Sequence, residues 1–202
     1  MTHTAHTAPG PAAPADPRPF LNTAVALAGR TLAAVRAGRL DDPTPCTEYT
    51  VGQLSRHLVA ALRRIALAAN GGDPASQPLV ADDFADGDVL KAWEAAARDA
   101  AEAWADPAVL ERALTLPFGT LPGAAVAVAF TTEFTLHTWD LATATGQRPT
   151  WDPELLKVCL AAAPRALPAQ PRGGPVPFAA VVDVAPEAPD IDRLVAWSGR
   201  TP

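Results

Sequence analysis

The stretch EFTLHTWD, Glu133–Asp140, follows the run AAVAVAF at residues 124–130, and together they predict the most apolar helix of the chain. This helix carries Glu133 and His137 four residues apart. Residues at positions i and i+4 lie on one face of a helix, so both side chains point the same way. If that face is buried, each polar group loses water and needs a partner. The spacing alone leaves two interpretations open, a buried ion pair or two ligands of a metal ion.

The composition favours packed helices in a single domain. The 202 residues suffice for one substantial core, nearly half of them are hydrophobic, and aromatic residues are few. The formal charge is -6 and no Lys/Arg cluster is present. Neither a nucleic-acid surface nor an anionic-membrane surface is therefore expected, because both need a basic footprint. We expect a small-molecule substrate or a protein partner.

The sequence indicates a cytoplasmic protein with free thiols. Residues 1–6 have neither the basic nor the apolar region of a secretory signal. The most apolar run is interrupted by charged and polar side chains within residues 133–140, so it does not suit a membrane span. Cys46 and Cys159 are too few for a disulfide framework.

Apolar residues at helical spacing predict four long helices after a loose arm at residues 1–18, whose Pro, Ala and Thr side chains offer little to bury. Thr50 and Gln53 form a capping-box pattern at the start of the second helix, and Gly146 suits the position after the fourth. The signals that bound the four helices are Pro19 and Gly38, Thr50 and Asn70, Val89 and Asp106, and Pro122 and Gly146.

A shorter helix and a tail follow. Asp152 and Pro153 open a fifth helix, which we expect Pro164 to stop. The remaining segments are a Pro- and Gly-rich wrapping tail (164–177), a candidate extended piece (178–184), one or two final helical turns closed by Gly199 (190–198), a crossover loop that helps cover a pocket (73–88) and a stretch with no periodic element (108–120).

Only two histidines lie outside the arm, His57 and His137, and both fall on the apolar face of an expected helix. Two imidazoles and the Glu133 carboxylate would leave an open position on zinc or a similar ion, as in a catalytic site. The alternative is a buried Glu133–His137 ion pair, with His57 as an unrelated core residue that makes one hydrogen bond. Asp140 could accept the second N–H of His137, serve as a fourth ligand, or lie on the helix surface.

The cysteine and hydroxyl side chains show no pattern of nucleophilic catalysis. Cys46 precedes a helix start, where the helix dipole could lower the pKa of its thiol. Neither Cys46 nor Cys159 has a histidine beside it in the sequence, however, so we expect both to be buried structural residues. No nucleophile elbow and no Gly-rich phosphate loop is present.

Two motifs resemble a known family. The segment PTPCTEYTV at residues 43–51 leads to Leu54 and His57, and HTWDLA occupies residues 137–142. They resemble the DinB/YfiT-like metal-binding superfamily, in particular the actinobacterial group that is similar to the N-terminal domain of mycothiol-dependent maleylpyruvate isomerase. The ending at residues 192–200 is also similar to that group.

The resemblance implies an all-α fold. It is a DinB-like four-helix bundle of up-down-down-up type with a short fifth helix and an extended C-terminal tail, in one domain over residues 19–202. The resemblance also implies a divalent metal, zinc before others, held by His57, Glu133 and His137. Other members carry a third histidine in place of Glu133, which leaves the choice of metal open.

The implied function is that of a thiol-dependent transferase or isomerase that acts on a small electrophilic substrate, with mycothiol as co-substrate. A metal ion would lower the pKa of the thiol and hold the thiolate beside the substrate. Asp140 would orient a ligand, and the loops at 73–88 and 108–120 would shape specificity. The chain ends at Pro202, short of that enzyme's separate C-terminal domain, so maleylpyruvate isomerisation itself is not expected.

Two alternatives stay open. In the first, the metal stabilises a non-catalytic binding module and no thiol reaches the ion. In the second, the same bundle serves specialised metabolism without a thiol, and Trp93, Phe130 and Trp139 line an apolar pocket. The sequence leaves the substrate and the oligomeric state open, a homodimer included.

Overall fold

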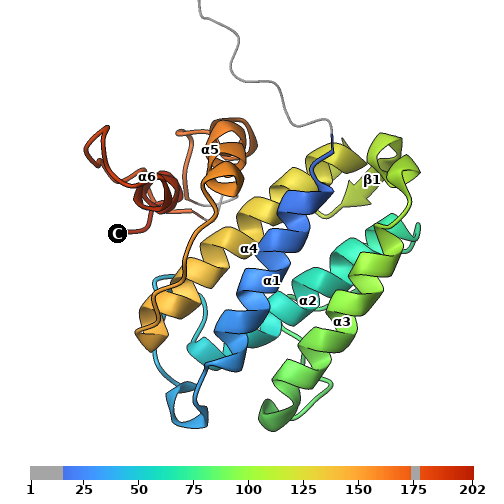
Figure 1. Cartoon of the computed structure of the whole chain (residues 1–202), viewed down its shortest axis with the longest axis horizontal. Coiled ribbons are helices and arrows are strands. Elements are labelled where there is room, and N and C mark those ends of the chain that lie inside the picture. The colour runs from blue at the N-terminus through green and yellow to red at the C-terminus, as the bar shows by residue number, and fades with distance from the viewer. Residues whose placement is uncertain (1–15, 174–177) are drawn as a thin grey trace, which may run out of the picture.

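Four long helices, α1 (Arg18–Ala33), α2 (Val51–Ala69), α3 (Val89–Ala103) and α4 (Gly123–Thr145), run alongside one another (Figure 1). The computed structural model describes residues 16–173 and 178–202. Within these ranges, α4 packs against α1 and α2, and α3 packs against the same two helices. The mostly helical fold is confirmed, and the second and fourth helices have the predicted ends.

The capping box predicted for α2 is present. Thr50 Oγ1 accepts a hydrogen bond from the Gln53 backbone N–H, and Gln53 Oε1 accepts one from the Thr50 backbone N–H. Two donors that would otherwise lack partners at the helix start are thereby satisfied. The cap fixes where α2 begins, and so it fixes the position of His57 two turns further along.

α1 begins at Arg18, one residue before the expected Pro19. The Arg18 guanidinium donates to the carbonyl oxygens of Trp104 and Ala105, which follow α3, and so ties the start of one helix to the end of another. Arg18 belongs to α1 and not to the arm expected at 1–18. Residues 1–15 of that arm lie outside the described residues.

α4 is the central helix and, with 23 residues, the longest of those described. Apolar side chains surround it, and a helix of this kind needs cover on every side. α1 and α2 supply part of that cover. α4 begins at Gly123, where a Cβ would lie 2.0 Å from the carbonyl oxygen of Val109, so only glycine fits. Gly146 ends it in the left-handed conformation, as predicted.

A short hairpin occupies part of the segment expected to lack regular structure. β1 (Ala113–Leu116) pairs antiparallel with β2 (Gly119–Pro122). Alternate side chains of β1 are buried, and Thr115 Oγ1 lies 3.0 Å from Thr120 Oγ1 across the strands. The expectation for residues 108–120 is wrong because strands of four residues show too little alternation to be recognised in a sequence.

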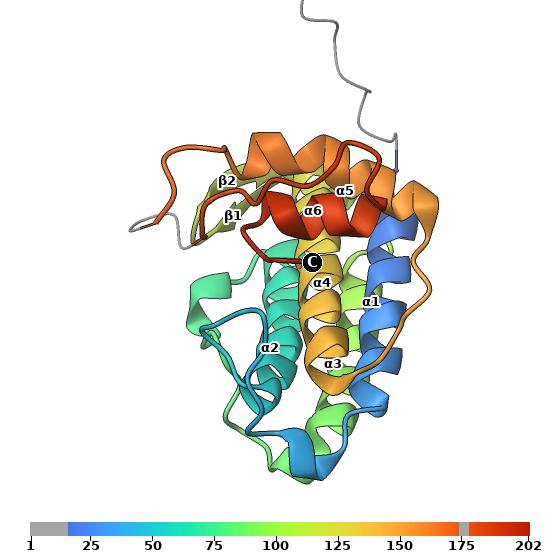
Figure 2. The ribbon, with the colours of Figure 1, turned by 90° about the vertical axis from the view of Figure 1, so that its left-hand side faces the viewer.

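α5 (Pro153–Ala166) and α6 (Asp190–Trp197) lie across the end of the long helices that also carries the hairpin (Figure 2). They pack against each other and against α4. Pro164 lies inside α5 and does not stop it, contrary to expectation. A proline removes one hydrogen-bond donor from the helix, and α5 ends only two residues later.

The C-terminal segment closes on α6. Residues 178–184 form no strand, although the Val182 backbone N–H donates to the Ala196 carbonyl oxygen at 3.0 Å. Gly199 ends α6 with a φ of 86°, as predicted. Residues 174–177 of the expected wrapping tail lie outside the described residues. Across the described part of the chain, we find no helix with the length and apolarity that crossing a membrane requires.

Candidate metal centre

α2 and α4 bring His57, Glu133 and His137 together. Glu133 Oε1 lies 3.0 Å from His57 Nε2 and 3.3 Å from His137 Nε2. One ligand atom from each residue lies within 4.8 Å of the other two. Glu133 and His137 are one turn apart on α4, and His57 comes from α2, so the packing of these two helices builds the cluster.

The three residues differ in their access to solvent. His57 and His137 are 5% and 7% exposed, whereas 33% of the Glu133 side chain is exposed. Solvent therefore reaches the cluster from the side of Glu133. We call this the open side of the cluster.

His57 is held from three directions. Its Nδ1 lies 2.8 Å from the carbonyl oxygen of Leu79, in the connection between α2 and α3. A carbonyl oxygen only accepts hydrogen bonds, so Nδ1 carries a proton and Nε2 faces Glu133. The Tyr49 ring stacks on the imidazole, with centroids 4.8 Å apart and planes 25° apart. These contacts leave His57 little freedom to turn away from the cluster.

His137 is held by a buried carboxylate. Its Nδ1 lies 3.0 Å from Asp140 Oδ2, and Asp140 is fully buried, so it does not lie on the helix surface. Arg200 Nε donates to Asp140 Oδ1 at 2.6 Å, and Arg200 Nη2 donates to Oδ2 at 2.7 Å. We call this side, formed by Asp140 and Arg200, the closed side.

The charges of the cluster depend on one another. Burial raises the pKa of Glu133, but the charge of His137 and hydrogen bonds from both histidines outweigh it and hold the pKa well below its usual range. Burial lowers the pKa of His137, but Glu133 and Asp140 outweigh it and raise the pKa to about 9. Without a metal, His137 is therefore an imidazolium between two carboxylates at neutral pH.

The residues fit a divalent cation. Each histidine uses Nδ1 to hold an oxygen acceptor and turns Nε2 to Glu133, and ligating histidines nearly always have such a partner on their second nitrogen. Two imidazoles and one carboxylate match the ligands of zinc sites that keep an open position. The ion pair and the metal site have the same geometry, because a cation would take the place of the Nε2 proton of His137.

The sequence profile of the mycothiol maleylpyruvate isomerase N-terminal domain matches residues 21–142, a range that includes the whole cluster and Asp140. This chain belongs to that family. The resemblance inferred from residues 43–57 and 137–142 is thereby confirmed.

The chain is also similar to individual known proteins. An uncharacterised protein of Mycobacterium tuberculosis, recorded in strains CDC 1551 and H37Rv, is 39% identical over 171 residues, or 84% of this chain and 90% of the relative. The crystal structure of the mycothiol-dependent maleylpyruvate isomerase aligns with a TM-score of 0.56 and 15% identity, over 73% of this chain and 68% of that one. A histidine-to-alanine mutant of that enzyme aligns with the same TM-score over 78% and 72%. The likeness to both structures is one of fold.

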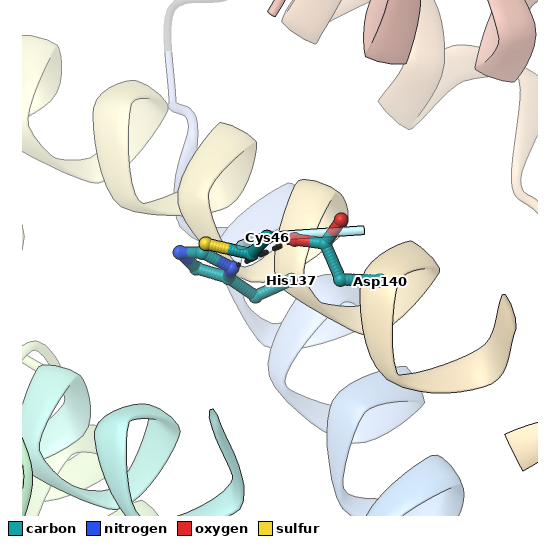
Figure 3. A group of neighbouring side chains, drawn as sticks. All are labelled: Cys46, His137 and Asp140. Carbon is teal, nitrogen blue, oxygen red and sulfur yellow. Dashed lines mark hydrogen bonds and ion pairs between the residues drawn. The ribbon is translucent and has the colours of Figure 1, made fainter. Parts of the chain in front are cut away.

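In this family member Cys46 lies beside the closed side. Its sulfur is within 4.8 Å of ligand-type atoms of His137 and Asp140. Figure 3 shows the three side chains next to one another. Arg200 already donates to both Asp140 oxygens, so this second group suits a cation less well than the first. Burial raises the pKa of the Cys46 thiol more than Arg200 lowers it, so the pKa is raised and not lowered as the helix dipole alone suggested. Cys159 is buried, as expected, whereas Cys46 is only partly buried, contrary to expectation.

Three contacts of the cluster were not anticipated from the sequence. They come from Tyr49, from the Leu79 carbonyl and from Arg200. Tyr49 and Arg200 do lie in the segments that resemble the family, which is the one signal that could have pointed to them. The Leu79 contact uses a backbone atom, which no residue type reveals.

Proposed function

We propose that this protein is a divalent-metal-dependent enzyme in which His57, Glu133 and His137 bind zinc. The observation that carries the proposal is the convergence of both Nε2 atoms on Glu133 Oε1 while both Nδ1 atoms are held by oxygen acceptors. The single domain over residues 19–202 is taken to be a DinB-like bundle of up-down-down-up type. The long connection between α2 and α3 supports this topology, because it suffices to return along the bundle.

We further propose that the substrate is a small electrophile and that the co-substrate is a low-molecular-weight thiol such as mycothiol, in a transferase or isomerase reaction. When bound, the cation lowers the pKa of a coordinated thiol and holds the sulfur as a nucleophile. Family membership supports the choice of thiol. The solved enzyme that shares the fold is, by its name, mycothiol-dependent.

The protein's own side chains would then bind and orient the thiol and the substrate. The open side admits thiol and substrate next to Glu133, and the closed side keeps the proton of His137 on Nδ1. The 73–88 segment, which the proposal assigns to specificity, is fixed by Arg56 through the carbonyl oxygens of Ala81 and Phe84. Residues 108–120, in the region of the hairpin, are also proposed to contribute to specificity.

Metal content is the first test. Protein purified without chelator is expected to hold about one divalent ion per chain, and added zinc is expected to raise its melting temperature. A variant with His3→Ala and His6→Ala is the control, because it removes the arm histidines and should keep the same content. No ion in the purified protein, together with no shift on adding zinc, would falsify the proposal.

Thiol binding is the second test. Mycothiol added to the cobalt-substituted protein is expected to produce a sulfur-to-cobalt charge-transfer band. The band must persist in Cys46→Ser, because only then does it report the added thiol and not the cysteine near His137. Cobalt that binds while every thiol stays out of its coordination would favour the metal-stabilised binding module or an enzyme without a thiol.

A further inference from the structure

The closed side contains a buried carboxylate, Asp140, that is held by a buried arginine. Asp140 is fully buried, and Arg200 donates to both of its oxygens, in a fork that no lysine could reproduce. Arg200 is itself 8% exposed and lies 60 residues further along the chain. A buried arginine and a buried aspartate are costly to desolvate, so the pair is weak as a device for stability alone.

The guanidinium is preorganised by the turn that carries it. Arg200 Nη1 donates to Ser198 Oγ at 3.0 Å, and the Ser198 hydroxyl donates to the Val195 carbonyl oxygen at 2.7 Å. The Arg200 backbone N–H donates to the same carbonyl at 3.0 Å. Gly199 makes the turn with positive φ, and a Cβ there would lie 2.6 Å from the Ala179 carbonyl oxygen. The turn therefore holds the Arg200 side chain in place independently of its contacts with Asp140.

The fork determines how Asp140 meets His137. With N–H donors on both oxygens, the carboxylate cannot rotate, and Oδ2 stays 3.0 Å from His137 Nδ1. A carboxylate so engaged can only accept from the ring, which places the ring proton on Nδ1. When Nε2 gives up its proton, its lone pair then points toward Glu133, where a cation would bind. Arg200 thus acts on the cluster indirectly, because it is bonded to Asp140 and Asp140 in turn is bonded to His137.

We propose that Arg200 is a positioning residue that, through Asp140, fixes the orientation and tautomer of His137 and so sets the cation affinity of the His57–Glu133–His137 cluster. The inference rests on the proposed function. It adds a residue from the C-terminal turn to a site whose other members lie on α2 and α4. Removing the fork leaves a buried carboxylate that can turn, and His137 loses its fixed direction.

The test compares Arg200→Gln with Arg193→Gln. Arg193 is the matched control, because it lies on α6, is exposed and, among residues 16–173 and 178–202, pairs only with Asp190 of the same helix at 3.1 Å. We expect Arg200→Gln to weaken cobalt binding about 10- to 100-fold, the usual effect of removing a partner of a ligating histidine. The visible spectrum of bound cobalt and the ¹⁵N shifts of the His137 ring should also change. Arg193→Gln should match the wild type in all three.

Each outcome decides the inference. A folded Arg200→Gln protein that binds cobalt within twofold of wild type, with the same spectrum, overturns it. If Arg200→Gln does not fold, Arg200→Lys decides, because it keeps the buried charge but not the fork. Weakened binding with a wild-type circular dichroism spectrum then supports the inference, and unchanged binding overturns it. If the wild-type protein itself binds no cation, the proposed function fails and this inference fails with it.

Discussion

The open and closed sides of the cluster use the same chemical group for opposite purposes. On both sides of His137 a carboxylate from α4 faces an imidazole nitrogen. Glu133 is one-third exposed and its partners are the two histidines, whereas Asp140 is fully buried and bonded by Arg200. A carboxylate near water can exchange one partner for another at little cost. A buried one must keep its partners, because an unpaired charge in the interior is costly.

This difference suggests a division of labour. In the proposed function, the open side would exchange a proton for a cation and admit a substrate, and the closed side would keep His137 in one orientation during that exchange. Four predictions test the division, from the largest expected effect to the smallest.

Removing His137 should affect the cluster most, because this residue touches both sides. We expect His137→Ala to reduce bound metal from about one ion per chain to less than about a tenth, since two ligands rarely hold zinc in competition with water. Elemental analysis measures this, and His3→Ala is the control from the arm. Full metal content in His137→Ala would mean that the ion binds elsewhere.

The two carboxylates should differ in their effect on stability. Asp140→Asn leaves Arg200 buried without a counter-charge and should lower the free energy of unfolding by about 3–5 kcal/mol. Glu133→Gln, at a side chain that is one-third exposed, should lower it by less than Asp140→Asn does in metal-free protein. Urea denaturation of both variants measures the difference. Equal losses would show that the open and closed sides do not differ in this way.

The metal-free protein should lose stability as the pH rises, because of His137. Its pKa of about 9 in the folded protein lies above the ordinary value of 6.5, so the folded state holds this proton more tightly than the unfolded chain. The contribution to stability is complete below pH 6.5 and is lost as the pH rises to about 9. The melting temperature should fall across this window, and His137→Gln should remove that part of the fall. Identical pH profiles for the two proteins would contradict the argument.

Cys46 should contribute least, although its sulfur lies close to His137 and Asp140. It lies outside the His57–Glu133–His137 group, so Cys46→Ser should change zinc affinity by less than about threefold and stability by less than about 1 kcal/mol. Zinc titration and urea denaturation measure the two effects. A tenfold loss of affinity would instead make Cys46 a ligand.

The sequence predicts the open side much better than the closed side. Glu133 and His137 are placed by helical periodicity, and His57 follows because no other histidine lies outside the arm. Arg200 belongs to an irregular turn 60 residues beyond Asp140, and no periodicity relates the two. Long-range contacts between irregular segments depend on the completed packing, which residue spacing does not encode.

The parts of the fold that the sequence predicts differ in the same way from the parts that it misses. The ends of α2 and α4 are predicted because local chemistry sets them, through the Thr50 cap and the left-handed Gly146. The β1–β2 hairpin is missed because its strands are four residues long, and the path of α5 past Pro164 depends on how the end of that helix packs. Local signals fix the ends of α2 and α4, but α1 ends at Ala33, before the Gly38 signal, so a long helix can also end where its sequence does not predict.

The pairing of Asp140 with Arg200 also sets an order of events during synthesis. The 60 residues between them take roughly 3–12 s to translate at the usual rate of chain growth. His57, Glu133 and His137 have all left the ribosome by then, so the three can meet before the partner of Asp140 exists. A nascent chain would therefore bring the three residues together before His137 is fixed, and the proposed high-affinity binding of a cation would belong to the finished protein.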